Sequence, residues 1–366
     1  MKDSKFTRAE LIQKSLELLK HHQHASGSFP ASPHFEEFRY CFLRDASFCA
    51  YALLLYGEFE RCRKFLEWCH HAIISCSEKV ERVKQKWPGS DPIAMNELLP
   101  VRFELDGSQE LSEWPNFQID CYGTWLWCLE QYVNISKDEQ ILTDVKVSVD
   151  LTVSYLETVW TFASFDCWEE HSYERHTSSL ACVIGGLRSV SSLYDDDKVG
   201  KFSERITEQL LKAVTPEGIF PKFLSGGGID ASTLWLSVPY GVVPVNHPSM
   251  QLTVKEIESV LLKGNGLYRY PNDTYYGGGR WPLLNCFLAW YKMETGHIKE
   301  AESLLEWVES LADENGYFPE NDSVVPLFPE HKQKWITKWG PHVLPPLLWT
   351  QSMYLIAQHF LNQGKR

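Results

Sequence analysis

The connections between the predicted helices alternate between short and long, and this alternation limits the fold more than any other feature. Helical periodicity recurs along all 366 residues, whereas the alternation typical of strands is nearly absent. Short connections occur at Gly57 and at "ISK", "DDDKVG" and "TGH", and most of the others are long. We predict about twelve helices, over residues 7–22, 44–56, 58–79, 117–134, 137–161, 174–194, 198–213, 230–238, 251–262, 281–296, 297–312 and 344–363.

Six helical hairpins closed into a ring explain the alternation. Inner and outer helices then take turns along the chain, so the long links emerge together on one rim and the short links on the other. Helices eight and nine are an exception, because about a dozen residues join them. An open α-solenoid is the alternative, but no repeat of 30–45 residues supports it. We therefore predict an all-α (α/α)6 barrel, with residues 1–366 as one catalytic domain.

Composition excludes several classes of partner. The net charge is −13 and no Lys/Arg block occurs, which argues against nucleic acid. The first residues lack the apolar core of a signal peptide, and no apolar run approaches the roughly 18 residues of a membrane helix. The ten cysteines include no CxxC pair and are typical of buried thiols in a reducing compartment. We expect a cytoplasmic protein; the sequence does not indicate its oligomeric state.

No metal site or organic cofactor is predicted. His21, His22 and His24 lie near a helix end without a carboxylate partner, which favours solvated or capping side chains. His176 has two interpretations, contact with the pocket or satisfaction by the backbone. The glycine runs at 226–228 and 277–279 follow no strand and are therefore not dinucleotide-binding motifs.

The long links combine carboxylates with aromatic rings. Examples are "EWPNFQIDCYG", "DCWEEHSYERHT", "GNGLYRYPNDTYYGGGRWP" and "NGYFPENDSVVPLFPEHKQKWITKWGP". Turn chemistry explains the glycines and prolines, but it does not explain acidic aromatic loops that converge on one rim. A pocket of rings and hydrogen-bonding carboxylates suits a neutral polyol such as a sugar.

Cleavage of a glycosidic bond needs two carboxyl groups, a protonated one and an ionised one, on opposite sides of the anomeric carbon. Glu169 or Glu170 in "WEE" and Glu320 in "FPEN" are the best candidates. The six-hairpin ring places their links opposite each other, which favours the wider spacing of an inverting enzyme. The alternative for any single glutamate here is a solvated charge or a helix cap.

Several motifs together resemble the glucoamylase family, glycoside hydrolase family fifteen. They are "RYCFLRDASF", "DCWEEHSYERHTSS", "GIDASTLWL", "YRYPNDTYYGG" and "GYFPENDSVVP", in the family's order from about residue 38 to 360. The resemblance implies an (α/α)6 barrel in which Glu169 is the general acid and Glu320 the general base. It also implies substrate binding by Arg44, Asp45, Trp114, Trp168, Glu170 and Arg269, without a cofactor.

Three functions remain open at this point. The first is an inverting exo-acting hydrolase that releases β-glucose from the non-reducing end of small α-glucosides. The others are a trehalase-like enzyme of the same fold and a silent sugar-binding regulatory domain. Glutamate at both 169 and 320 favours an enzyme. Asn321 stands where the family usually has Gln, which bears on substrate preference more than on chemistry.

Overall fold

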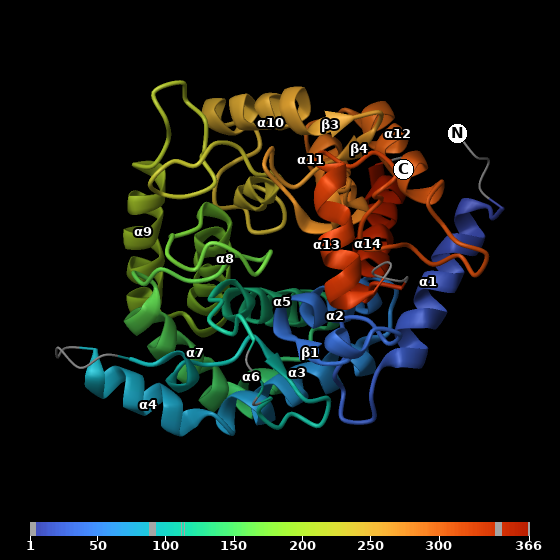
Figure 1. Ribbon diagram of the computed structural model, residues 1–366. Helices are drawn as coiled ribbons and strands as arrows, with labels where there is room; N and C mark the ends of the chain where they lie inside the picture. The colour runs from blue at the N-terminus through green and yellow to red at the C-terminus, as the bar shows by residue number, and fades with distance from the viewer. Residues whose placement is uncertain (1–4, 88–92, 111, 113, 341–345, 365–366) are drawn as a thin grey trace.

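The computed structural model describes residues 5–87, 93–110, 112, 114–340 and 346–364. Its helices form two concentric layers, with α1, α7, α9, α10 and α12 at the periphery of the ring in Figure 1. The helices are α1 (Arg8–His22), α2 (Leu43–Leu55), α3 (Phe59–Ile74), α4 (Ser77–Lys86), α5 (Asp120–Ser136), α6 (Gln140–Asp144), α7 (Lys146–Val159), α8 (Thr177–Tyr194), α9 (Asp197–Leu211), α10 (Pro248–Leu261), α11 (Pro282–Glu294), α12 (Ile298–Glu309), α13 (Pro329–Trp339) and α14 (Leu348–Gly364). The short 3-10 helices η1 (Glu36–Phe38), η2 (Met95–Glu97), η3 (Ala231–Leu236) and η4 (Tyr275–Gly277) lie between them.

The inner layer is a closed ring of six elements. Each of α2, α5, α8, η3, α11 and α14 packs on the next, and α14 packs back on α2. The outer helices α1, α3, α7, α9, α10 and α12 each precede their inner partner in the chain. This closed order is the predicted (α/α)6 barrel, and it places all six long links on one rim.

Inner helices are apolar around most of their circumference, because they pack on both neighbours and on the outer layer. In α2 every residue from Leu43 to Leu54 is buried, whereas the outer helix α9 buries only one face. Close contact between α5 and α8 depends on glycine: a Cβ on Gly186 would lie 2.3 Å from the carbonyl oxygen of Gly123. The packing of the core therefore specifies the ring of inner helices, and this ring positions the long links on one rim.

Four short strands accompany the helices. Strand β1 (Cys41–Phe42) pairs antiparallel with β2 (Arg102–Phe103), in the register Cys41 with Phe103. Strand β3 (Leu262–Lys263) pairs antiparallel with β4 (Gly266–Leu267), in the register Leu262 with Leu267. Both pairs lie in long links; β1 directly precedes α2.

Several predicted helix bounds are wrong. The helices predicted over 58–79 and 137–161 are each broken, into α3 and α4 and into α6 and α7. The predicted helix 230–238 is the 3-10 helix η3, which ends three residues before Pro239, a residue that cannot donate to a helix. Part of the predicted helix 344–363 lies outside the described residues. Helix α13 was predicted as loop.

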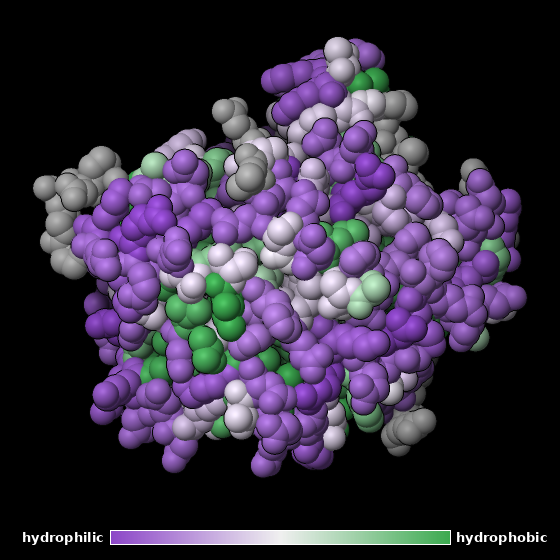
Figure 2. All heavy atoms as spheres, turned by 90° about the horizontal axis from the view of Figure 1, so that it is seen from below, coloured by the Kyte–Doolittle hydropathy of each residue, from purple (hydrophilic) through white to green (hydrophobic). Residues whose placement is uncertain are grey.

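The surface seen from below the view of Figure 1 is mostly hydrophilic, with hydrophobic side chains gathered in one area (Figure 2). This fits the acidic composition of the chain. Within the described residues, no helix has the length and apolar character that a membrane span requires.

Candidate active site

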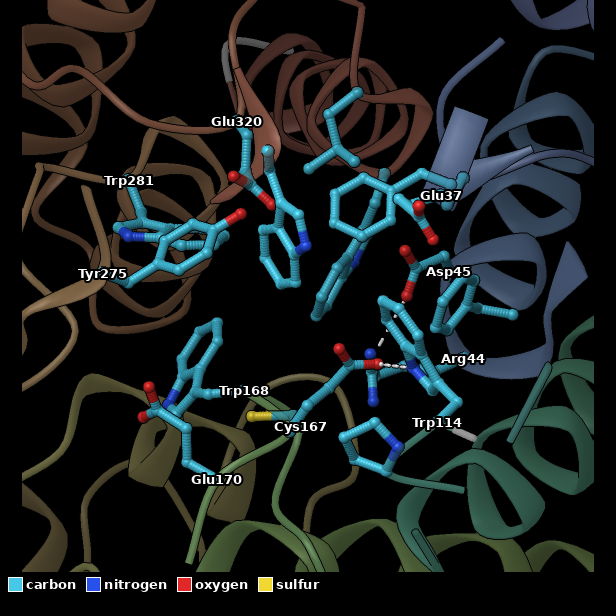
Figure 3. A pocket seen from close by; sticks show the side chains of 18 of the residues that line it. Glu37, Arg44, Asp45, Trp114, Cys167, Trp168, Glu170, Tyr275, Trp281 and Glu320 are labelled. Carbon is cyan, nitrogen blue, oxygen red and sulfur yellow. Dashed lines mark hydrogen bonds and ion pairs between the residues drawn. The ribbon is translucent and has the colours of Figure 1, made fainter. Parts of the chain in front are cut away.

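A cavity of about 490 Å³ opens on the rim that carries the long links. All eight candidate residues predicted from the sequence line it (Figure 3). They are Arg44, Asp45, Trp114, Trp168, Glu169, Glu170, Arg269 and Glu320. The predicted barrel thus brings four different links together in one pocket.

Arg44 and Asp45 lie in the first turn of α2, at the floor of the pocket. The Arg44 guanidinium is buried; its Nε is 3.2 Å from Asp45 Oδ1, and its Nη1 donates to Asp120 Oδ2 and Gln118 Oε1, both at 2.9 Å. Burial lowers the pKa of Arg44, but Asp120 and Asp45 raise it well above its ordinary value. Burial raises the pKa of Asp45 to about 6, although Arg44 opposes this shift. Arg44 is therefore a fixed cation between the carboxylates of Asp45 and Asp120.

Glu169 has an unusual backbone for a residue with a side chain. Its φ is +64°, a left-handed conformation that costs about 1–2 kcal/mol outside glycine. Its side chain accepts a hydrogen bond from Trp114 Nε1 at 2.8 Å, through Oε1. Gln118 Nε2 is 3.4 Å from the same oxygen. These donors leave Oε2 of Glu169 free to hold a proton.

Glu320 approaches the pocket from the other side. In Figure 3 it lies across the cavity from Cys167 and Trp114. Cys167 belongs to the link that carries Glu169, and Trp114 belongs to the link that donates a hydrogen bond to Glu169. Its carboxylate is buried and accepts from Asn321 Nδ2 at 3.3 Å. The ring of Tyr275 lies near it along the wall.

The pKa values of both carboxyls are shifted toward neutrality. Burial raises the pKa of Glu169 to about 7, against the opposing effects of Trp114 and Arg44. Burial raises the pKa of Glu320 to about 8; Tyr275 and Arg269 oppose this shift, and the charge of Glu169 adds to it. Because each charge disfavours the other, the pair favours a state that holds one proton.

Glu170 and Arg269 form the wall beside Trp168. Arg269 is buried; its Nε donates to Asp273 Oδ2 at 2.7 Å, and its Nη2 is 3.5 Å from Glu170 Oε1. The Tyr270 hydroxyl donates to the other oxygen of Glu170. Glu170 is thus held by two donors from the link between α10 and α11.

Aromatic side chains form most of the remaining wall, and sequence reasoning assigned no role to several of them. Trp281, Tyr275, Trp349, Trp335 and Trp339 all line the pocket. Trp281 and Tyr275 lie in "DTYYGGGRWP" and Trp335 and Trp339 in "KQKWITKWGP", so their place on two of the acidic aromatic links was the available signal. Trp335 and Trp339 come from α13 and could not be placed without that helix.

The histidines singled out in the sequence stay outside the pocket. His176 is buried, and its Nε2 lies 2.9 Å from the carbonyl oxygen of Ser164 and 3.2 Å from that of His171, so the backbone satisfies it. His21 and His22 contact each other edge to face. Among the described residues, no group of three or more His, Cys, Asp or Glu side chains could hold a metal ion.

Comparison with known proteins identifies the family. The sequence profile described as glycosyl hydrolases family 15 matches residues 7–339. The chain belongs to this family. An isomaltose glucohydrolase of Kribbella flavida is 30% identical over 354 residues, which cover 95% of this chain and 91% of the relative.

Solved structures agree with this family 15 assignment. A wild-type glycosidase with 30% identity has a TM-score of 0.92 and covers 96% of each chain, and a variant of it contains glucose. A bacterial glucoamylase complexed with acarbose, 17% identical, has a TM-score of 0.72 over 97% of this chain and 55% of that chain, which supports the fold. The predicted barrel and the predicted enzyme class, an exo-acting α-glucoside hydrolase, are confirmed. These relatives do not support the alternative, a silent sugar-binding regulatory domain.

Proposed function

We propose that this family 15 hydrolase releases β-glucose from the non-reducing end of short α-glucosides in one inverting displacement. The observation that carries the proposal is the pair of carboxyls, half-buried Glu169 and buried Glu320, on links from opposite sides of one pocket. The raised pKa of each, about 7 for Glu169 and about 8 for Glu320, supports a pair that shares one proton near neutral pH; because the higher pKa belongs to Glu320, the productive form with the proton on Glu169 is the minor one in the free enzyme. A general acid and a general base together require this protonation state.

In this mechanism Glu169 donates its proton to the glycosidic oxygen. Glu320 is ionised and removes a proton from a water molecule, which attacks the anomeric carbon from the face opposite the leaving group. Trp114 donates to Oε1 of Glu169, so the proton resides on Oε2. Each carboxyl changes its protonation once per cycle, and solvent restores the pair after the products leave.

The remaining pocket residues hold the sugar. Asp45 accepts from hydroxyl groups of the terminal glucose, and Arg44 fixes this carboxylate. Arg269 and Glu170 bind across the cleaved bond, where the guanidinium also lies 5.2 Å above the Trp168 ring. Trp114 and Trp168 offer flat faces to the C–H faces of the sugar rings.

We further propose isomaltose-type α-1,6 disaccharides as the preferred substrates. The support is the identity of 30% with an isomaltose glucohydrolase over most of both chains. Incubation with isomaltose, maltose, panose, dextrin and trehalose, followed by an assay of free glucose, tests this preference. A clear preference for maltose or trehalose would contradict it.

The roles of the two carboxyls can be separated with a substrate that needs no acid. The fluoride of α-D-glucosyl fluoride leaves without protonation, whereas the sugar of isomaltose leaves as an alcohol. Glu169→Gln should lower kcat on isomaltose by at least about 10²–10⁴-fold and act far better on the fluoride. Glu320→Gln should fail on both substrates. Equal loss on both substrates for Glu169→Gln would remove it as the acid.

The stereochemistry has its own measurement. An inverting reaction on an α-glucoside releases β-glucose first. Proton NMR of the anomeric signals during the first minutes shows which anomer appears. Initial α-glucose would indicate a covalent intermediate and would contradict the role of Glu320.

We also propose that the protein works in a reducing compartment such as the cytoplasm. All ten cysteines are buried and free. Buried thiols that never pair are typical of proteins that fold in reducing conditions.

A further inference from the structure

Lys222 is a buried lysine that the proposed mechanism does not use. It lies in the link between α9 and η3, and its side chain is only 5% exposed. Its Nζ is 3.1 Å from Asp230 Oδ2 and 3.8 Å from Asp166 Oδ2. Within the described residues, no other lysine or arginine forms an ion pair with either carboxylate. One ammonium thus balances two buried carboxylates.

The first carboxylate, Asp230, fixes the indole of Trp168. Trp168 Nε1 donates to Asp230 Oδ2 at 3.1 Å. Asp230 is also the N-cap of η3, where its Oδ1 accepts from the backbone of Ser232 at 2.8 Å. Asp230 therefore connects the rigid start of η3 to a ring that lines the pocket.

The second carboxylate, Asp166, fixes the backbone on both sides of Glu169. Its Oδ1 accepts from the backbone N–H of Trp168 at 3.0 Å and from that of Glu170 at 2.9 Å. These two bonds hold the turn in which Glu169 has its left-handed conformation. The other oxygen, Oδ2, has no hydrogen-bond partner, so the charge of Lys222 is its main compensation.

A third contact joins Lys222 to the opposite link. Its Nζ lies 3.2 Å from the centroid of the Tyr270 ring, a cation–π contact. The hydroxyl of Tyr270 donates to Glu170. Lys222 therefore reaches three side chains that each position a part of segment 166–170.

We propose that Lys222 is a positioning residue for the acid Glu169, because its ammonium pairs with Asp166 and Asp230, the two carboxylates that hold the segment that carries Glu169. The proposal rests on the acid role assigned to Glu169 above. Without the ammonium, the two buried carboxylates repel each other and one of them takes up a proton. A protonated carboxyl is a weaker acceptor, so the turn relaxes and the acid moves away from the glycosidic oxygen.

The substitutions Lys222→Met and Lys222→Gln test this, with isomaltose and α-D-glucosyl fluoride as probes. Displacement of a catalytic group by about 1 Å can cost on the order of 10²-fold, so kcat on isomaltose should fall by about that factor. KM should change much less, because Arg44 and Asp45 still hold the terminal sugar. Activity on the fluoride should be largely kept, since that reaction does not need the acid.

Lys292→Met is the matched control. Lys292 also balances two carboxylates, with Nζ 2.7 Å from Glu258 and 2.7 Å from Glu300, but it does not line the active-site pocket. Its loss should lower the melting temperature and leave the ratio of the two activities unchanged. The double variant Lys222→Met/Asp166→Asn removes one charge of each sign and should recover part of the lost kcat on isomaltose.

Two results would overturn the inference. Equal losses on isomaltose and on the fluoride in folded Lys222→Gln would show a merely structural role, and unchanged kcat on isomaltose would show no role. Glu169→Gln is measured in parallel. If Glu169→Gln loses the fluoride reaction as well, the acid role of Glu169 fails and this inference fails with it. If Glu169→Gln retains the fluoride reaction but the Lys222 variants do not show the expected selective loss on isomaltose, only this inference fails.

Discussion

Substitution of Trp114 by Phe tests the electrostatics of the acid most directly. The indole Nε1 donates to Glu169 Oε1 at 2.8 Å and thereby stabilises the ionised carboxylate. Phe removes this donor and keeps an aromatic ring beneath the Arg102 guanidinium, whose carbon lies 3.7 Å from the ring centroid. The pKa of Glu169, already raised to about 7, should therefore rise further.

The size of the shift follows from the hydrogen bond. A bond to a charged group contributes about 1.5–3 kcal/mol, and one pKa unit corresponds to about 1.36 kcal/mol. The loss thus allows a rise of about one to two units. Gln118 Nε2, 3.4 Å from the same oxygen, can move closer and replace part of the bond, so we expect the lower value.

The assay is the pH dependence of kcat/KM on isomaltose. The active form has Glu169 protonated and Glu320 ionised, so activity falls at high pH when the pair loses its one proton and at low pH when the pair gains a second. A higher pKa of Glu169 raises both macroscopic pKa values of the pair, so the alkaline limb should move to higher pH. Because the two carboxyls are coupled, the acid limb should move in the same direction.

Trp68→Phe provides the control, since Trp68 Nε1 donates to the carbonyl oxygen of Leu105 at 3.0 Å and does not line the pocket. It should leave the profile unchanged. An alkaline limb that stays in place, or moves to lower pH, in Trp114→Phe would refute the assignment of Glu169 as the titrating acid.

Three further predictions concern the sugar site, the core and metal ions. Asp45→Asn should lower kcat/KM by about 10- to 100-fold on isomaltose, maltose and trehalose alike, since loss of a charged hydrogen bond costs about 1.5–3 kcal/mol; an effect on one linkage alone would place Asp45 on the leaving-group side. Gly186→Ala should destabilise the fold by at least about 1–3 kcal/mol in thermal unfolding, because its Cβ would lie 2.7 Å from Gly123 Cα; an unchanged melting temperature would contradict the close contact of α5 and α8. Dialysis against EDTA should leave activity intact, and restoration of lost activity by one divalent ion would contradict the two-carboxylate mechanism.

The sequence predicted the ring because the fold depends on connection lengths and on helices with continuous apolar surfaces. The eight pocket residues could be named because motifs that resemble those of the family lie at the start of α2 and on four of the six links that the ring brings together. Helix α13 escaped prediction for a physical reason: none of its residues is fully buried, and its apolar face is short, with Trp335, Ile336 and Trp339 among polar side chains. Its Trp335 and Trp339 line the pocket through contacts with Tyr275 of η4, and Trp339 also stacks on Trp114.

Local geometry within segment 166–170 also could not be predicted. The left-handed backbone of Glu169 depends on Asp166, and Asp166 depends on a lysine that lies more than fifty residues later. Such a dependence arises from tertiary packing, and no local propensity encodes it. The motif "DCWEE" indicates which residues are present but not which of its carboxyls remains free to titrate.

The pattern of ion pairs answers that last question. Arg44 is balanced by Asp45 and Asp120, Arg269 by Asp273 and Glu170, and Lys222 by Asp230 and Asp166. Each of these three buried cations thus pairs with two carboxylates. Within the described residues, Glu169 and Glu320 line the pocket, are not exposed, and lie within ion-pair distance of no lysine or arginine.

This division of charge has a chemical consequence. A cation lowers the pKa of the buried carboxyl beside it, as Arg44 does for Asp45 and Lys222 for Asp166, whereas Glu169 and Glu320 have no cation within ion-pair distance to hold their charge. A cation placed beside Glu169 or Glu320 should therefore remove the ability of that carboxyl to exchange a proton. A cation introduced beside Glu320 would keep it ionised but weaken it as a base, and a cation beside Glu169 would remove the proton that the leaving group needs.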